Sequence, residues 1–215
     1  MKPFGRTCER MVSHSVGHNT KSQVRIQNIS SKKEVESTRD SLESGDHFSY
    51  GDEVNLSLFP TLRKMWTLRG QQVQVPTHGQ DERAYGIGAV NYYTGETVML
   101  TRKHKRKGDI AAMLRALVER HAIGRIYLTW DNAHTHFNGE IETVLKEAKG
   151  RLILLYLPTS SPWLTPIEML WRSMRYGVTH CELFTELSDL EAAFLDFFIT
   201  TPKETVKRII GSEAV

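Results

Sequence analysis

The sequence predicts an α/β protein built on a mixed sheet, and two observations support this fold class. Between residues 46 and 101, apolar side chains alternate with the period of two that is typical of strands. After residue 108 the apolar spacing becomes helical, and helical segments then alternate with short apolar runs. Strands separated by single helices usually join a sheet in parallel. We therefore expect three antiparallel strands followed by parallel strands, with helices on both faces.

Two segments predict the antiparallel strands. In residues 46–59 (DHFSYGDEVNLSLF), side chains such as Phe48 and Tyr50 recur at every second position. Residues 84–100 (AYGIGAVNYYTGETVML) consist of two apolar arms around Thr94-Gly95, a dipeptide typical of turns. This second segment is therefore expected to form a hairpin.

The other elements follow in order along the chain. Helical spacing predicts helices over residues 31–43, 109–121, 138–149, 162–177 and 188–200, with a last helix that begins at Pro202. Short apolar runs predict core strands over residues 125–130 and 151–157.

The chain of 215 residues is expected to contain one main domain, residues 46–215. Residues 1–45 are polar, so we interpret most of them as an arm or linker. No apolar run approaches the roughly 20 residues of a membrane helix, so no membrane partner is expected. Cys8 and Cys181 form no spaced motif, which favours a reducing cytoplasmic compartment.

Three acidic residues occupy positions suited to a metal site. Asp52 lies within the first expected strand, Asp131 directly follows the strand at 125–130, and Glu168 lies in the helical segment after the next strand. Ligand sites of open α/β sheets lie at the carboxyl ends of strands. Carboxylates are hard oxygen ligands that suit Mg²⁺ or Mn²⁺, and two such ions can catalyse in-line displacement at phosphorus. In a chain with 25 acids, position alone does not single out these three.

The residues around the acids add a family resemblance. The segments WDNAHTH and LPTSSPWLTPIEMLW, with 36 residues (132–167) between Asp131 and Glu168, resemble those of DDE transposases of the mariner-like insertion-sequence superfamily. The upstream segment GDEVNLSLFPTLRKMWTLRG resembles the first-strand segment of the family and places the first acid at Asp52. Glu53 is then expected on the opposite, solvent-facing side of the strand.

This resemblance implies an RNase H-like fold and a metal-dependent enzyme that cleaves DNA at transposon ends and transfers the strand into target DNA. The metal ligands would be Asp52, Asp131 and Glu168, holding two Mg²⁺ or Mn²⁺ ions. Asn132 and His134 would support the ligands or the scissile phosphate, and a purely structural role for His134 is an equal alternative. Because relatives pair two transposon ends, the resemblance also implies a homodimer.

The chain departs from the family pattern in two ways. Thr165 stands where the family has asparagine, and Ser160 and Trp163 also differ, although none is a proposed ligand. The helix-turn-helix modules by which relatives recognise transposon ends have no counterpart in residues 1–45. We therefore expect a fragment, the product of a decayed element or one partner of a split reading frame.

A basic run and a set of histidines leave alternatives open. Residues 102–107 carry five positive charges in six positions, on Arg102, Lys103, Lys105, Arg106 and Lys107. Such a run is either a solvated loop or a contact to the DNA backbone. Asp131, His134, His136, His180 and Cys181 could make a zinc site, but their spacing fits no known ligand pattern.

Two other functions compete with the transposase hypothesis. One is a DNA-binding or oligomerising remnant without catalysis, and the other is an RNase H-like nuclease with a different substrate. The four tryptophans, Trp66, Trp130, Trp163 and Trp171, are interpreted as packing residues rather than base-stacking platforms.

Overall fold

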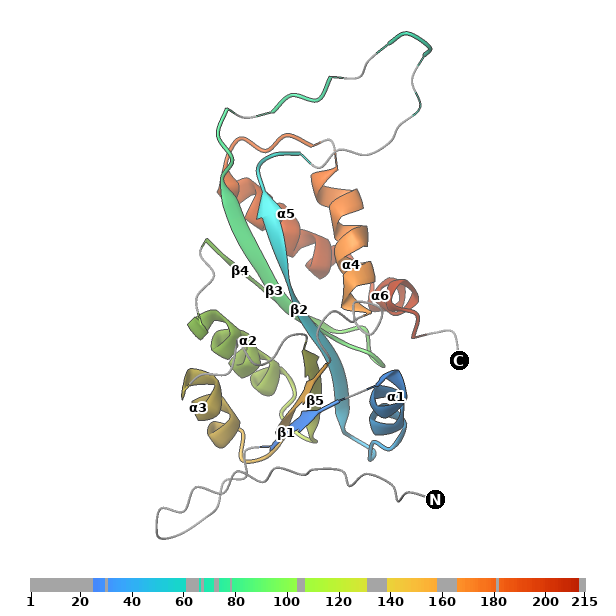
Figure 1. Ribbon diagram of the computed structural model, residues 1–215, viewed down its shortest axis with the longest axis vertical. Helices are drawn as coiled ribbons and strands as arrows, with labels where there is room; N and C mark the ends of the chain where they lie inside the picture. The colour runs from blue at the N-terminus through green and yellow to red at the C-terminus, as the bar shows by residue number, and fades with distance from the viewer. Residues whose placement is uncertain are drawn as a thin grey trace, which may run out of the picture.

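A six-stranded mixed sheet forms the centre of the molecule (Figure 1). The computed structural model describes residues 25–29, 31–60, 66, 68–71, 74–77, 79–103, 107–130, 139–157, 166–180 and 182–212. The strands are β1 (Arg25–Asn28), β2 (His47–Ser57), β3 (Arg83–Asn91), β4 (Thr97–Arg102), β5 (Ile126–Trp130) and β6 (Leu152–Tyr156). Their order across the sheet is β1-β6-β5-β2-β3-β4.

The strand directions agree with the prediction. β2, β3 and β4 pair antiparallel, whereas β5 pairs parallel with β2 and with β6. At the predicted turn between β3 and β4, Gly95 has a φ of +68°, a conformation that glycine adopts without steric cost. The predicted hairpin is therefore confirmed.

Helices cover both faces of the sheet. They are α1 (Lys32–Asp40), α2 (Lys107–Arg120), α3 (Gly139–Glu147), α4 (Ile167–Met174), α5 (Leu187–Thr200) and α6 (Lys203–Ile210). The helices α2 and α3 share one apolar core with the sheet, and the other four share a second core with its opposite face (Figure 1). None of these described helices is long and apolar enough to cross a bilayer.

The sheet separates the two cores, and strand β2 lies in its middle, with one face toward each core. Its side chains at Phe48, Tyr50, Val54 and Leu56 are buried in the core that α4 and α5 cover. A glycine of β3 brings α5 close to this part of the sheet: a Cβ at Gly86 would lie 2.6 Å from Cζ of Phe194. Because Gly86 has no side chain, α5 packs directly against the backbone of β3.

Part of the stretch that we interpreted as an arm is packed in this domain. Strand β1 pairs parallel with β6, and Ile29 and Val35 are buried in the core. The polar composition concealed this packing because a short edge strand is held by backbone hydrogen bonds and only a few apolar side chains. Residues 1–24 lie outside the described residues.

Two further expectations need correction. Trp66 was expected in the core, but its side chain is fully exposed in the connection between β2 and β3. The helix expected over 162–177 is described from Ile167 and extends past Met174 as a π-helical segment, Arg175–Thr179. Apolar periodicity locates the helical stripe but does not detect the wider turn at its end.

Candidate metal and nuclease site

Asp52 lies in the middle of the sheet, on the face that α4 covers. It sits between Tyr50 and Val54 on β2, and its neighbour across the β2–β3 pair is Gly88. Because side chains alternate along a strand, Asp52 shares the face of the buried Tyr50 and Val54. A carboxylate therefore occupies a row of side chains that is otherwise apolar.

Glu168 reaches the same place from α4. The helix buries Ile167, Leu170, Trp171 and Met174, a stripe at helical spacing. Glu168 lies at the edge of this stripe, in the first turn of the helix, and is exposed to solvent. Its carboxyl group is within hydrogen-bonding contact of Asp52, although 115 residues (53–167) separate the two in sequence.

The surroundings of Asp52 oppose its negative charge. Burial raises the pKa of Asp52 to about 6, and the neighbouring Glu168 adds to the rise. Hydrogen bonds from the backbone N–H of Glu53 and from the indole of Trp171 act in the opposite direction. The two acids thus form a site at which a cation would relieve both the desolvation and the mutual repulsion.

Trp171 is a member of this site that our sequence analysis assigned to packing alone. Its side chain is 1% exposed, as expected for a core residue. Its Nε1–H, however, donates a hydrogen bond to Oδ2 of Asp52 over 3.0 Å. The three-residue spacing from Glu168 places both side chains on adjoining faces of one helix, but it does not show that the indole N–H points at Asp52.

The third expected acid follows β5 in sequence. This strand ends at Trp130, which lies opposite Gly51 in the parallel pair of β5 with β2, one residue before Asp52. Asp131, together with Asn132 and His134, lies outside the described residues. The structure therefore brings Asp52 and Glu168 together and does not test the position of Asp131.

The residues present fit a divalent cation. Asp52 and Glu168 offer oxygen ligands, the donors that Mg²⁺ and Mn²⁺ prefer. Within the described ranges no three His, Cys, Asp or Glu side chains gather as a metal site, and the third expected ligand is outside these ranges. Of the residues considered for zinc, only His180 is described, and its ring lies 4.5 Å from that of Tyr176.

Glu53 differs from our expectation in one respect. It follows Asp52 on β2 and so projects to the opposite face of the sheet, as predicted. That face is covered by α2 and α3, and Glu53 is half-buried rather than solvent-facing. The expectation was wrong because it assumed that only one face of this strand is covered.

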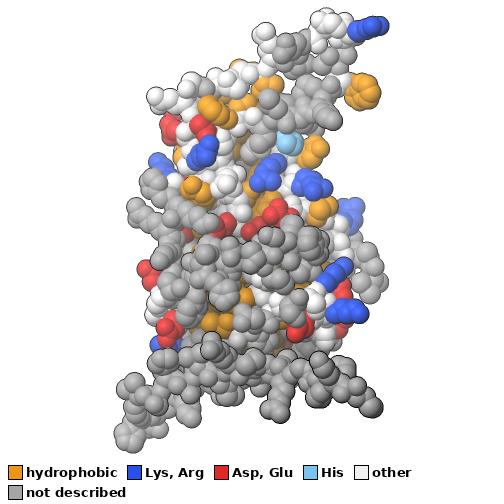
Figure 2. Space-filling view, in the orientation of Figure 1, with side chains coloured by type: hydrophobic (Ala, Val, Ile, Leu, Met, Phe, Trp, Pro, Cys, Tyr) orange, Lys and Arg blue, Asp and Glu red, His pale blue; other side chains and the backbone are white. Residues whose placement is uncertain are grey.

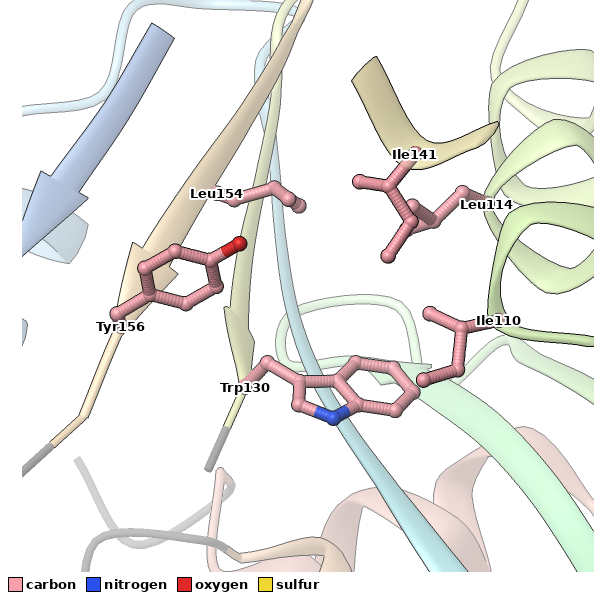
Figure 3. A pocket seen from close by; sticks show the side chains of 6 residues that line it. All are labelled: Ile110, Leu114, Trp130, Ile141, Leu154 and Tyr156. Carbon is pink, nitrogen blue, oxygen red and sulfur yellow. The ribbon is translucent and has the colours of Figure 1, made fainter. Parts of the chain in front are cut away.

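A small cavity lies behind the end of β5, on the face opposite Asp52 (Figure 3). Its volume is about 10 Å³, roughly the space for one water molecule. It is lined by Ile110, Leu114, Trp130, Ile141, Leu154 and Tyr156. So small and apolar a cavity is a gap in the packing between the sheet and helices α2 and α3, and it has no room for a substrate.

The basic run of residues 102–107 is described only in part. Arg102 ends β4, and its Nε donates to Oδ1 of Asp109 in the first turn of α2 over 3.0 Å. Lys103 is exposed. The side chains of Lys105, Arg106 and Lys107 lie outside the described part of the chain. Contact of this run with DNA therefore stays a prediction.

Charged side chains of both signs are spread over the face shown in Figure 2. Acidic side chains lie near the middle of this face, and Lys and Arg side chains lie beside them.

Solved structures share this fold. The chain is similar to the Mos1 transposase paired-end complex with left transposon end, at a TM-score of 0.61 and 16% identity, covering 94% of this chain and 62% of that chain. It is also similar to the catalytic domain of Mos1 mariner transposase, at a TM-score of 0.55 and 14% identity, covering 82% of this chain and 81% of that chain. The fold is thus the RNase H-like mixed sheet of such catalytic domains.

Sequence comparisons give the family. A curated relative, the insertion element IS630 uncharacterized 39 kDa protein of Shigella sonnei, is 33% identical over 131 residues. The match covers 60% of this chain but only 38% of that relative. The family model of the DDE superfamily endonucleases matches residues 47–191, which include Asp52, Asp131 and Glu168. The chain therefore belongs to the DDE superfamily endonucleases.

Proposed function

We propose that this chain is the catalytic domain of an insertion-sequence transposase that cleaves DNA at transposon ends and joins the ends to target DNA. The observation that carries the proposal is the contact between Asp52 and Glu168. Two acids that are far apart in sequence, one on β2 and one on α4, are in contact. The chain that contains them belongs to a family of endonucleases. The names of the similar proteins, which include an insertion element and complexes with a transposon end, point in the same direction.

Asp52, Asp131 and Glu168 would hold the divalent ions, with Asn132 and His134 supporting them. When bound, Mg²⁺ or Mn²⁺ ions stabilise the attacking and leaving oxygens of a phosphodiester displacement. Structures of the Mos1 paired-end complex with Mn and with Mg favour this choice of metal. The protein contributes fixed ligands: Asp52 is held on a central strand, and Glu168 on the first turn of a helix packed against it.

The substrate would be DNA, bound as a transposon end and as a target. Lys103 and its basic neighbours would contact phosphates, which carry no sequence information. We expect the active assembly to be a homodimer, since two ends must be joined, and to work on DNA in the cytoplasm, at the nucleoid of a prokaryotic host. A DNA-binding remnant or a nuclease for another substrate is not favoured by the family match.

The test is metal-dependent nicking of DNA by the purified chain and by three variants. With Mg²⁺ or Mn²⁺, the wild-type chain should nick a supercoiled plasmid, and Asp52→Asn, Asp131→Asn and Glu168→Gln should reduce nicking to background. Glu119→Gln is the matched control because Glu119 is exposed on α2, in the layer opposite α4. All variants should remain folded by circular dichroism.

Other outcomes would separate the competing functions. A folded wild-type chain that binds DNA but never nicks it would support the remnant. Cleavage of RNA–DNA hybrid in preference to DNA would support a different nuclease. Full activity of Asp131→Asn or Glu168→Gln would contradict the assignment of the ligands.

A further inference from the structure

Trp171 is held so that its indole N–H faces the carboxylate of Asp52. The ring of Trp171 is stacked on Phe194, with centroids 6.2 Å apart and an interplanar angle of 29°. Phe198 meets it edge-on at 5.8 Å. With 1% of the side chain exposed, the indole has little freedom to turn. The direction of its N–H is therefore set by the packing of α4 and α5.

A buried indole N–H needs an acceptor, and Asp52 provides one. Tryptophan has one donor and no acceptor, so leaving the N–H without a partner in the core would cost free energy. Oδ2 of Asp52 accepts this bond at 3.0 Å. A hydrogen bond to a carboxylate is stronger than one between neutral groups, so one oxygen of Asp52 is held in a fixed direction.

One helix therefore supplies both contacts of Asp52 on this face. Glu168 and Trp171 lie three residues apart on α4, and both reach the same carboxyl group. Any shift of α4 along the sheet would move the second acid and the anchor of the first acid together. The relative placement of Asp52 and Glu168 thus depends on Trp171 as well as on the backbone.

We propose that Trp171 is a positioning residue of the metal site: its indole N–H anchors Oδ2 of Asp52 and sets the orientation in which this carboxylate meets a divalent ion. This inference rests on the metal-binding function proposed above. Groups that orient a metal ligand through a hydrogen bond typically change metal affinity or activity about 10- to 100-fold when they are removed.

The decisive experiment measures Mn²⁺ binding without DNA, by electron paramagnetic resonance of the free ion. Trp171→Phe removes the N–H and keeps an aromatic ring. Replacement of Trp171 by β-(3-benzothienyl)alanine exchanges the N–H for sulfur at nearly constant shape and serves if the phenylalanine variant does not fold. Phe197→Leu alters the same aromatic cluster, in which Phe197 packs edge-on against Phe198, and removes no hydrogen bond to Asp52.

We expect Mn²⁺ to bind about 10-fold more weakly to both Trp171 variants and with wild-type affinity to Phe197→Leu. In nicking assays the Trp171 variants should need more metal for half-maximal rate. If the wild-type chain binds Mn²⁺ and both Trp171 variants match it, or if Phe197→Leu loses as much affinity as they do, the positioning role is overturned. A wild-type chain that neither binds Mn²⁺ nor nicks DNA overturns the proposed function itself and this inference with it.

Discussion

The indole ring of Trp130 on β5 lies directly over Gly51 on β2, where a side chain would otherwise stand. A Cβ at position 51 would come within 2.5 Å of Cζ3 of Trp130. The two residues are register partners in the parallel pair of these strands. Gly51 immediately precedes Asp52, and Trp130 immediately precedes Asp131. The close approach thus joins β2, which carries Asp52, to β5, which ends one residue before Asp131 in the sequence.

Gly51→Ala should destabilise the fold because the methyl group would collide with a buried ring. Overpacking of this kind typically costs about 1–3 kcal/mol. Chemical denaturation should show this loss, with reduced Mn²⁺ binding if the strands separate. Gly139→Ala is the matched control, since a Cβ there meets no atom within 4 Å at the start of α3. Equal stability of Gly51→Ala and the wild type would contradict the packing described for Trp130.

Asp52→Asn should stabilise the metal-free protein at neutral pH. Burial raises the pKa of Asp52 from 3.8 to about 6, so the folded chain holds this proton more tightly than the unfolded chain. The ionised group therefore destabilises the fold above pH 6, and this cost disappears as the pH falls below about 4. An asparagine oxygen can still accept the bond from Trp171.

Denaturation of metal-free protein as a function of pH checks this prediction. We expect a gain on the order of 2 kcal/mol for Asp52→Asn at pH 7.5, which shrinks between pH 6 and pH 4. Added Mg²⁺ should stabilise the wild type and not the variant, because binding favours only the folded state that has the ligand. A variant less stable than the wild type at pH 7.5 would contradict the prediction.

Glu96→Gln should have the opposite effect at neutral pH. Oε1 of Glu96 lies 2.6 Å from Nζ of Lys203 and 3.5 Å from Nη2 of Arg120. The hydrogen bond from Lys203 lowers the pKa of Glu96. Ionised Glu96 therefore contributes to the free energy of unfolding above pH 4.5, and this contribution is lost as the pH falls through the lowered pKa.

We expect Glu96→Gln to lower the free energy of unfolding by about 0.5–1 kcal/mol at pH 7. The effect is small because Lys203 is 57% exposed and solvent screens the pair. Thermal melts in low and high salt check this prediction, since salt should reduce the difference in melting temperature between the wild type and Glu96→Gln. A difference that persists unchanged at pH 3 would show that something other than charge is responsible.

Lys103→Ala should weaken DNA binding in a salt-dependent manner. Removing one cation that binds a phosphate reduces the slope of log affinity against log salt by about 0.9. Arg102→Ala should reduce the slope less, because the guanidinium of Arg102 already pairs with Asp109. Fluorescence anisotropy with a short duplex between about 50 and 200 mM salt measures both slopes. An unchanged slope in Lys103→Ala would make the basic run a solvated loop.

Most of the sheet could be predicted because its strands and helices carry regular apolar spacing. The alternation in β2 and the helical stripe of α2 appear in the sequence as they do in the structure. Strand β1 could not be predicted, since four residues (RIQN) have no period and their partner β6 is far away in sequence. Edge strands of this length depend on backbone pairing, which apolar patterns do not encode.

The candidate site was predictable in part. The segments around Asp52 and Glu168 indicated that the two acids belong to one site, and the structure brings them into contact. The bond from Trp171 to Asp52 could not be predicted, because it depends on how α4 is rotated against β2. Tryptophan in a helical stripe indicates packing, and only the folded structure shows where its N–H points.

The edge position of β1 has a consequence for the order of folding during synthesis. Arg25 pairs with Ile153, so this strand leaves the ribosome long before its partner exists. At about 5–20 residues per second, roughly 6 to 25 seconds pass before β6 is made. Closing so long a loop is also entropically slow. Strand β1 therefore stays unpaired until β6 has been made. Its docking onto β6 should be among the last steps that complete the sheet.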